Sequence, residues 1–180
     1  MAVAVGLWDV MAREAAEESA LWGASLRSED EREREPIFSP LGVERFSLGL
    51  ETIYEGYLLH YGRPRLFAPA DDDTALLLGD YLYAHGVARI SALHGVAAVA
   101  DLSELISLCS QLRAEEADGD GDGEAWAATA ALLGANDGLA PARAALRDRA
   151  DAGALALLAR DAAGPEAVER ALAAHRERLR

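Results

Sequence analysis

The sequence predicts an all-α protein, a single-domain helical bundle, on three observations. Apolar residues make up 51% of the 180 residues. Alanine and leucine dominate among them and β-branched residues are scarce, a composition that favours helices because Ala and Leu lose little on entering one. Glycine and proline separate the apolar segments, as expected of helices joined by turns. A chain of this length fits one domain with a sizeable core, and the whole of 1–180 is expected to form it.

Three helices are expected in the N-terminal half. The first covers residues 2–27 and leads into a charged run that most simply forms an exposed loop or a frayed helix end. The second runs from Leu41 to about Tyr61, where glycine and proline follow. The third opens near Asp71 and continues to about residue 93, because three consecutive aspartates suit the free N–H groups and positive dipole of a helix N-terminus.

The C-terminal half predicts a helix over about 96–116, a short helix over 125–133 and a helical pair over about 139–179 that is split at Gly164–Pro165. An acidic loop, 118–124, separates the first two. Its aspartates match the first, third and fifth positions of an EF-hand calcium loop, but Thr129 stands where that loop needs a bidentate glutamate. An acidic interhelical loop is the favoured interpretation of Asp118–Glu124, with weak calcium binding as the alternative.

The charge of the chain excludes several kinds of partner. The net charge is −14 and every basic side chain is arginine. Such a chain lacks the basic surface that nucleic acids or anionic membranes need.

No apolar run reaches the ~20 residues of a membrane span, and the first residues lack the basic region of a signal peptide. The only cysteine, Cys109, lies in an apolar run and is expected to be a buried, inert thiol. A cytoplasmic protein is expected.

The run LLLGDYLYAHG, residues 76–86, places an aspartate inside an apolar segment. The segment 76–93 is apolar nearly all round, which predicts a central, buried helix. A buried carboxylate must be hydrogen-bonded, paired or bound to a ligand. Asp80 is therefore expected to be a structural hydrogen-bond hub, with a place in a binding pocket as the alternative.

This run, with Gly62-Arg63-Pro64 upstream of it, resembles the polyprenyl diphosphate synthases, the trans-isoprenyl transferases of the isoprenoid synthase fold. The resemblance covers about 41–134 and implies a reduced core of that fold. In the family an Asp-Asp-x-x-Asp motif on the preceding helix holds Mg²⁺ against the diphosphate of an allylic substrate. The same register places Glu51, Thr52 and Glu55 at the motif.

The resemblance thus supplies a set of candidate site residues. Glu51 and Glu55 share a helix face and are candidate Mg²⁺ ligands; with Asp80 they are the candidate catalytic residues. Arg63 and Arg65 are candidate ligands of a prenyl diphosphate, since the guanidinium fork suits phosphate oxygens. The alternatives are an exposed acidic face for the glutamates and loop pairing with Asp71–Asp73 for the arginines.

Departures from the family pattern weaken the catalytic interpretation. Thr52 replaces a carboxylate, Tyr61 stands where an arginine is expected, and Ala128 stands where a lysine would precede Thr129. No second aspartate motif follows. The expected function is a non-catalytic subunit or regulatory partner related to isoprenoid biosynthesis.

Such a protein would form a homo-oligomer, or a hetero-oligomer with a full-length synthase, through the helices at 76–93 and 96–112. The alternatives are residual Mg²⁺-dependent prenyl diphosphate binding or transfer, and an unrelated helical interaction protein.

Overall fold

The computed structural model describes residues 6–93, 95–114, 121–135 and 138–179. Within these ranges the chain is helical with short connections, and the predicted all-α fold is confirmed. The one β-type pairing between described residues is an isolated antiparallel bridge that joins Leu26 and Phe67. None of the helices in these ranges combines the length and the apolar character that crossing a membrane would require.

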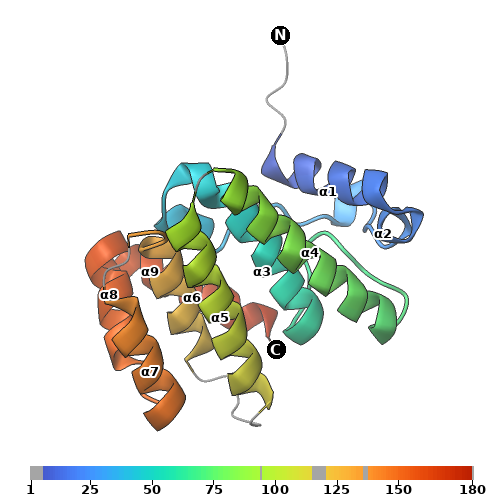
Figure 1. Ribbon diagram of the computed structural model, residues 1–180. Coiled ribbons are helices and arrows are strands. Elements are labelled where there is room, and N and C mark those ends of the chain that lie inside the picture. The colour runs from blue at the N-terminus through green and yellow to red at the C-terminus, as the bar shows by residue number, and fades with distance from the viewer. Residues whose placement is uncertain (1–5, 94, 115–120, 136–137, 180) are drawn as a thin grey trace.

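The helices follow one another along the chain with few long connections. The N-terminal half contains α1 (Leu7–Glu18), α2 (Ala20–Ala24), three 3-10 turns, α3 (Ser47–Tyr61) and α4 (Asp72–Ala92). The second half contains α5 (Val96–Ala114), α6 (Asp122–Ala131), α7 (Leu139–Arg149), α8 (Gly153–Ala163) and α9 (Pro165–Arg178). In Figure 1, α1 and α2 lie at one end of the molecule and α7 and α8 at the other, with α3 to α6 between them.

Local chemistry explains where the helices depart from the predicted boundaries. Ser19 interrupts the first predicted helix, because its extended backbone ends α1 and its hydroxyl accepts a hydrogen bond from the N–H of Leu21 at 3.1 Å. Ala150 ends α7 with a left-handed φ of 53°, so the C-terminal segment forms three helices instead of two. The capping role predicted for the aspartate run is confirmed, since the Asp71 carboxylate accepts from the N–H of Thr74 at 2.7 Å.

The antiparallel pair α3 and α4 packs backbone against backbone along a seam of glycines. Gly49 and Gly56 on α3 face Gly86 and Gly79 on α4, so each helix repeats glycine after seven residues, or two turns. A methyl group on Gly56 would lie 2.8 Å from the carbonyl oxygen of Gly79, and one on Gly86 would lie 2.8 Å from that of Gly49. Contacts this short leave no room for any side chain at the seam.

Two groups of buried side chains pack on either side of this pair. The larger one fills the space between α3 and α5 to α9 around Tyr54, Tyr57 and Trp126, all fully buried. The smaller one joins α1 to α3 and α4 through Trp8, Met11, Leu78 and Leu82, among others.

The predicted burial of α4 on all sides is wrong. Leu76 and Leu77 are 53% and 56% exposed, and Ala84 and Ala88 are exposed on the same side of the helix. The glycine seam turns one side of α4 toward α3, and the opposite side lies at the surface.

The seam yields a prediction about stability. Gly56→Ala should lower the free energy of unfolding by about 1–3 kcal/mol, because the new methyl group forces the two backbones apart. Gly23→Ala is the matched control: its methyl group would lie 3.5 Å from the nearest atoms, an ordinary contact, and should leave stability unchanged or raise it by about 0.4–1 kcal/mol. Urea unfolding of both variants measures the difference, and equal midpoints would contradict the tight seam.

Candidate functional site

Three of the five predicted site residues meet in a buried ion cluster. The Nη1 of Arg65 donates to Oε2 of Glu51 at 2.6 Å, and the Nε of Arg65 donates to Oε2 of Glu55 at 2.9 Å. All three side chains are 0% exposed. Glu51 and Glu55 lie one turn apart on α3, and Arg65 reaches them from the connection between α3 and α4.

The remaining carboxylate oxygens of this cluster accept backbone hydrogen bonds. Oε1 of Glu51 accepts from the N–H groups of Ile37 and Ser39 at 3.1 and 2.9 Å. Oε1 of Glu55 accepts from the N–H groups of Arg65 and Leu66, both at 2.7 Å. Four backbone donors that burial would leave without partners are thereby satisfied.

Two aromatic rings lie against the guanidinium of Arg65. Its carbon Cζ lies 4.5 Å from the ring centre of Trp8 and 5.0 Å from that of Tyr54, within the range of cation–π attraction. Burial alone would lower the pKa of Arg65, but the charges of Glu51 and Glu55 outweigh it and hold the pKa above its usual value. The group therefore stays positive and neutralises part of the buried negative charge.

In this geometry the carboxylate oxygens of both glutamates already bond groups of the protein, whereas a metal site needs oxygens that are free to coordinate the ion. Mg²⁺ keeps several waters in a tight octahedral shell, and the two carboxylates have no exposed surface to offer them. No group of three or more potential metal-binding side chains gathers anywhere in the described parts of the chain. Thr52 donates to the carbonyl of Leu48 at 2.6 Å. Mg²⁺ binding by Glu51 and Glu55 stays a prediction that would require this cluster to open.

Asp80 lies outside the cluster, and its predicted burial is wrong. Its side chain is 66% exposed, and its Oδ1 lies 3.3 Å from Nε2 of His60 on α3. Burial lowers the pKa of His60, and Asp80 offsets only part of that effect. The neighbouring position 79 has room only for glycine, since a methyl group there would lie 2.5 Å from Nε2 of the His60 ring. The Gly-Asp pair thus accommodates one histidine of the neighbouring helix.

Arg63 points to a different part of the molecule from Arg65. Its backbone N–H donates to the carbonyl of Arg178 at 2.9 Å, and its Nη2 donates to the carbonyl of Glu177 at 2.8 Å. Free carbonyls at a helix C-terminus favour such positive groups. Arg63 therefore caps α9, and the two predicted phosphate ligands do not converge.

A second polar network, which no spacing in the sequence predicts, joins α3, α5, α6 and α9. Asp122 accepts a short hydrogen bond from Tyr57 and one from Nη2 of Arg113 at 2.5 Å, and its Oδ1 lies 3.0 Å from Nε2 of His175. The other ring nitrogen of His175 lies 2.8 Å from the hydroxyl of Tyr54. Both ring nitrogens of His175 therefore have buried partners, Nε2 with Asp122 and Nδ1 with Tyr54.

Burial sets the ionisation of this network. Burial is the main cause that raises the pKa values of Tyr54 and Tyr57 above their ordinary range. It would also raise the pKa of Asp122, but the hydrogen bond and charge of His175, the hydrogen bond from Tyr57 and the charge of Arg113 hold that pKa below its usual value. Asp122 is thus a buried carboxylate at the start of α6. The other two aspartates of the candidate calcium loop, Asp118 and Asp120, lie outside the described residues.

A third group of buried polar contacts lies where the resemblance expects a lysine. Ala128 is fully buried, and the hydroxyl of Thr129 accepts from Nη2 of Arg143 at 2.9 Å. Nη1 of Arg143 donates to Asp101 at 3.3 Å. Thr129 thus bonds an internal arginine of α7.

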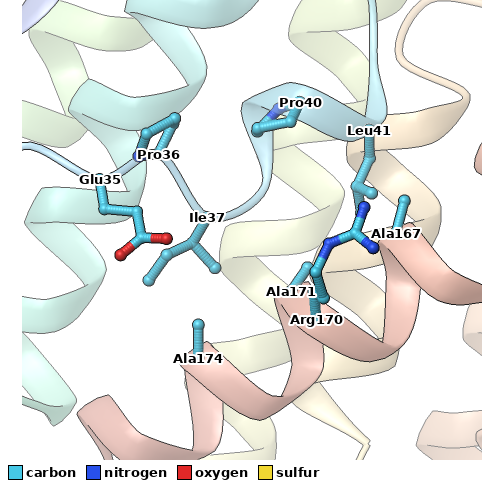
Figure 2. Close-up of a pocket in the computed structure, with 9 residues that line it drawn as sticks. All are labelled: Glu35, Pro36, Ile37, Pro40, Leu41, Ala167, Arg170, Ala171 and Ala174. Atoms are coloured by element: carbon cyan, nitrogen blue, oxygen red, sulfur yellow. The ribbon is translucent and has the colours of Figure 1, made fainter.

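The buried ion cluster also shapes an open cavity next to it. The segment 35–41, part of which Glu51 and Arg65 hold, forms one wall, and α9 forms the other (Figure 2). The cavity has a volume of about 290 Å³. Its lining consists of Glu35, Pro36, Ile37, Pro40, Leu41, Ala167, Arg170, Ala171 and Ala174.

Comparisons with known proteins do not assign a family to this chain. No protein-family model, no curated protein and no solved structure matches it.

The ion cluster predicts a large effect of removing its positive charge. Arg65→Leu should lower the free energy of unfolding by about 3–5 kcal/mol, because Glu51 and Glu55 would remain buried without a counter-charge. The matched control is Arg63→Leu, which removes an exposed arginine two residues away and should change stability by no more than about 1 kcal/mol. Chemical denaturation followed by circular dichroism measures both, and equal effects would contradict the ascribed role of Arg65.

The lowered pKa of Asp122 predicts a dependence of stability on pH. The unfolded chain binds a proton at Asp122 more readily than the folded protein does, so this contribution is complete above the ordinary aspartate pKa of about 3.9 and is lost as pH falls below it. Asp122→Asn should therefore flatten the fall of unfolding free energy below about pH 4. Denaturation curves between pH 2 and 7 measure the slope, and an unchanged slope in the variant would contradict this assignment.

Proposed function

We propose that this protein is a non-catalytic, polyprenyl-synthase-like helical protein that acts as a subunit or regulatory partner in isoprenoid biosynthesis. The observation that carries the proposal is the state of Glu51 and Glu55. Both stand where the resemblance places metal ligands, and both are fully buried against Arg65 and four backbone N–H groups. The guanidinium of Arg65 occupies the position beside both carboxylates that Mg²⁺ would need.

Two further features support a role in binding instead of chemistry. The hydroxyl of Thr52 is used within α3, and Ala128 offers no charge beside Thr129. Arg63 and Arg65 bond separate parts of the chain, so neither is arranged with the other around a common anion. Transfer of a prenyl group needs metal ions and cations together on one diphosphate.

The exposed side of α4 is the surface that we assign to a partner. It is a stripe that contains Leu76, Leu77, Ala84 and Ala88, with the exposed carboxylate of Asp80 between the leucines and the alanines, and we call it the α4 face. Large leucines followed by small alanines at helical spacing allow a second helix to approach closely and bury apolar area. The partner is a second copy of this chain or a full-length synthase, both helical.

One experiment with two measurements tests the proposal on the purified protein. Titration calorimetry with farnesyl diphosphate, with and without Mg²⁺, should give no magnesium-dependent heat. Light scattering after size-exclusion chromatography should give a mass above that of one chain, alone or after mixing with the synthase of the same cell. A Leu77→Glu, Ala84→Glu variant should lose that association, because it buries charge in the contact.

Ala154→Glu is the control for the added charge, since it lies at an exposed position of α8 away from the α4 face and should retain association. Magnesium-dependent binding of farnesyl diphosphate, followed by turnover, would overturn the non-catalytic assignment. A chain that stays monomeric both alone and with the synthase would overturn the assignment of a partner.

A further inference from the structure

The cavity between the segment 35–41 and α9 has an apolar floor and a charged side chain on each of two edges. Ile37, Leu41 and Ala171 are buried and form the floor, while Pro36 and Pro40 stand exposed at its edge. Figure 2 shows the carboxylate of Glu35 and the guanidinium of Arg170 on opposite sides of Ile37. A concave apolar surface with a few polar groups at its edge is the usual form of a small-molecule site.

The walls of this cavity are fixed by buried polar contacts. Nη1 of Arg65 donates to the carbonyl of Glu35 at 3.1 Å, and Glu51 holds the backbone of Ile37 and Ser39. On the other side, His175 anchors α9 to Asp122 and Tyr54. A site whose walls are already held in place loses little free energy in ordering itself around a ligand.

Arg170 is the feature that indicates an anion. Most arginines in the described ranges pair with a carboxylate or a carbonyl, as Arg65, Arg113, Arg143, Arg160 and Arg178 do. Arg170 is exposed and has neither a hydrogen-bond nor an ion-pair partner among the described residues; a few other exposed arginines, such as Arg149 and Arg176, share this, but Arg170 is the one that lines the cavity. An unpaired guanidinium beside an apolar floor suits a molecule with one anionic head and an apolar body.

We propose that this cavity binds a small aliphatic anion, with its carboxylate or phosphate head on Arg170 and its chain over Ile37, Leu41 and Ala171. The volume of about 290 Å³ lies at the lower limit of known ligand cavities, so the body is a chain of a few carbons. The charge of Glu35 repels a second anionic group and so sets the orientation. This site is separate from the α4 face and does not depend on the proposed partner.

The test is an NMR titration of the ¹⁵N-labelled full chain with hexanoate, hexyl phosphate and hexan-1-ol. Either anion should shift the amide signals of Ile37, Leu41 and Ala171, and the tighter one identifies the head group. The alcohol should bind at least about three times more weakly, because it cannot form a charge-assisted hydrogen bond with Arg170. Arg170→Gln should weaken anion binding by about three- to tenfold and leave alcohol binding unchanged.

Arg176→Gln is the matched control, because it removes an exposed arginine of the same helix that does not line the cavity and should leave anion binding unchanged. Ala167→Leu, a half-buried position in the wall, should fill the cavity and block both anions and the alcohol. Three outcomes would overturn the proposal: no shifts at these amides at millimolar anion, equal binding of anion and alcohol, or equal loss in Arg170→Gln and Arg176→Gln.

Discussion

The buried pairing of Arg65 with Glu51 and Glu55 is the interaction on which most of this structure depends. Burying three charges is costly unless each is paired and hydrogen-bonded, and here every group has partners. These partners come from four separate parts of the chain: α1 through Trp8, the segment 35–39, α3, and the connection that follows it. Each of these segments is fixed in position, because moving it would leave a buried charge without one of its partners.

Tyr54 joins this cluster to the second polar network. One side of its ring faces Arg65, and its hydroxyl meets His175 on α9. Its neighbour one turn along, Tyr57, bonds Asp122 at the start of α6 and stacks near His175. A single side of α3 therefore connects the N-terminal segment with the last helix. Polar groups in a dry interior must be satisfied together, so these contacts specify one arrangement of helices that apolar packing alone leaves open.

Much of the fold could be predicted from the sequence, because composition and turn residues act locally. The aspartates before α4 and the break at Gly164–Pro165 both needed only neighbouring residues to interpret. The candidate site was harder, because it depends on which side of a helix meets the core. The run that contains Asp80 reads as apolar on all sides, yet glycines at 79 and 86 turn one side toward α3 and leave Leu77 at the surface.

The two polar clusters differ in how far the sequence could reveal them. Glu51, Glu55 and Arg65 lie within fifteen residues, and the sequence predicts a common site for them, although as ligands of a metal and a diphosphate instead of one another. His175 lies 53 residues from Asp122 and 121 from Tyr54. No pattern of spacing connects residues so far apart, and a buried histidine on the last helix resembles any other histidine near a helix C-terminus.

The glycine seam between α3 and α4 also determines how this molecule can move. Helices in switching proteins often slide past one another or jump by one turn, which requires side chains that can interlock in a second register. Here two levels of backbone contact, at Gly49 with Gly86 and at Gly56 with Gly79, fix a single register. A shift of one turn would drive Ile53 or Tyr83 into a backbone. The central pair is therefore a rigid frame, and any change of shape must come from the elements attached to it, the N-terminal helices on one side and α9 on the other.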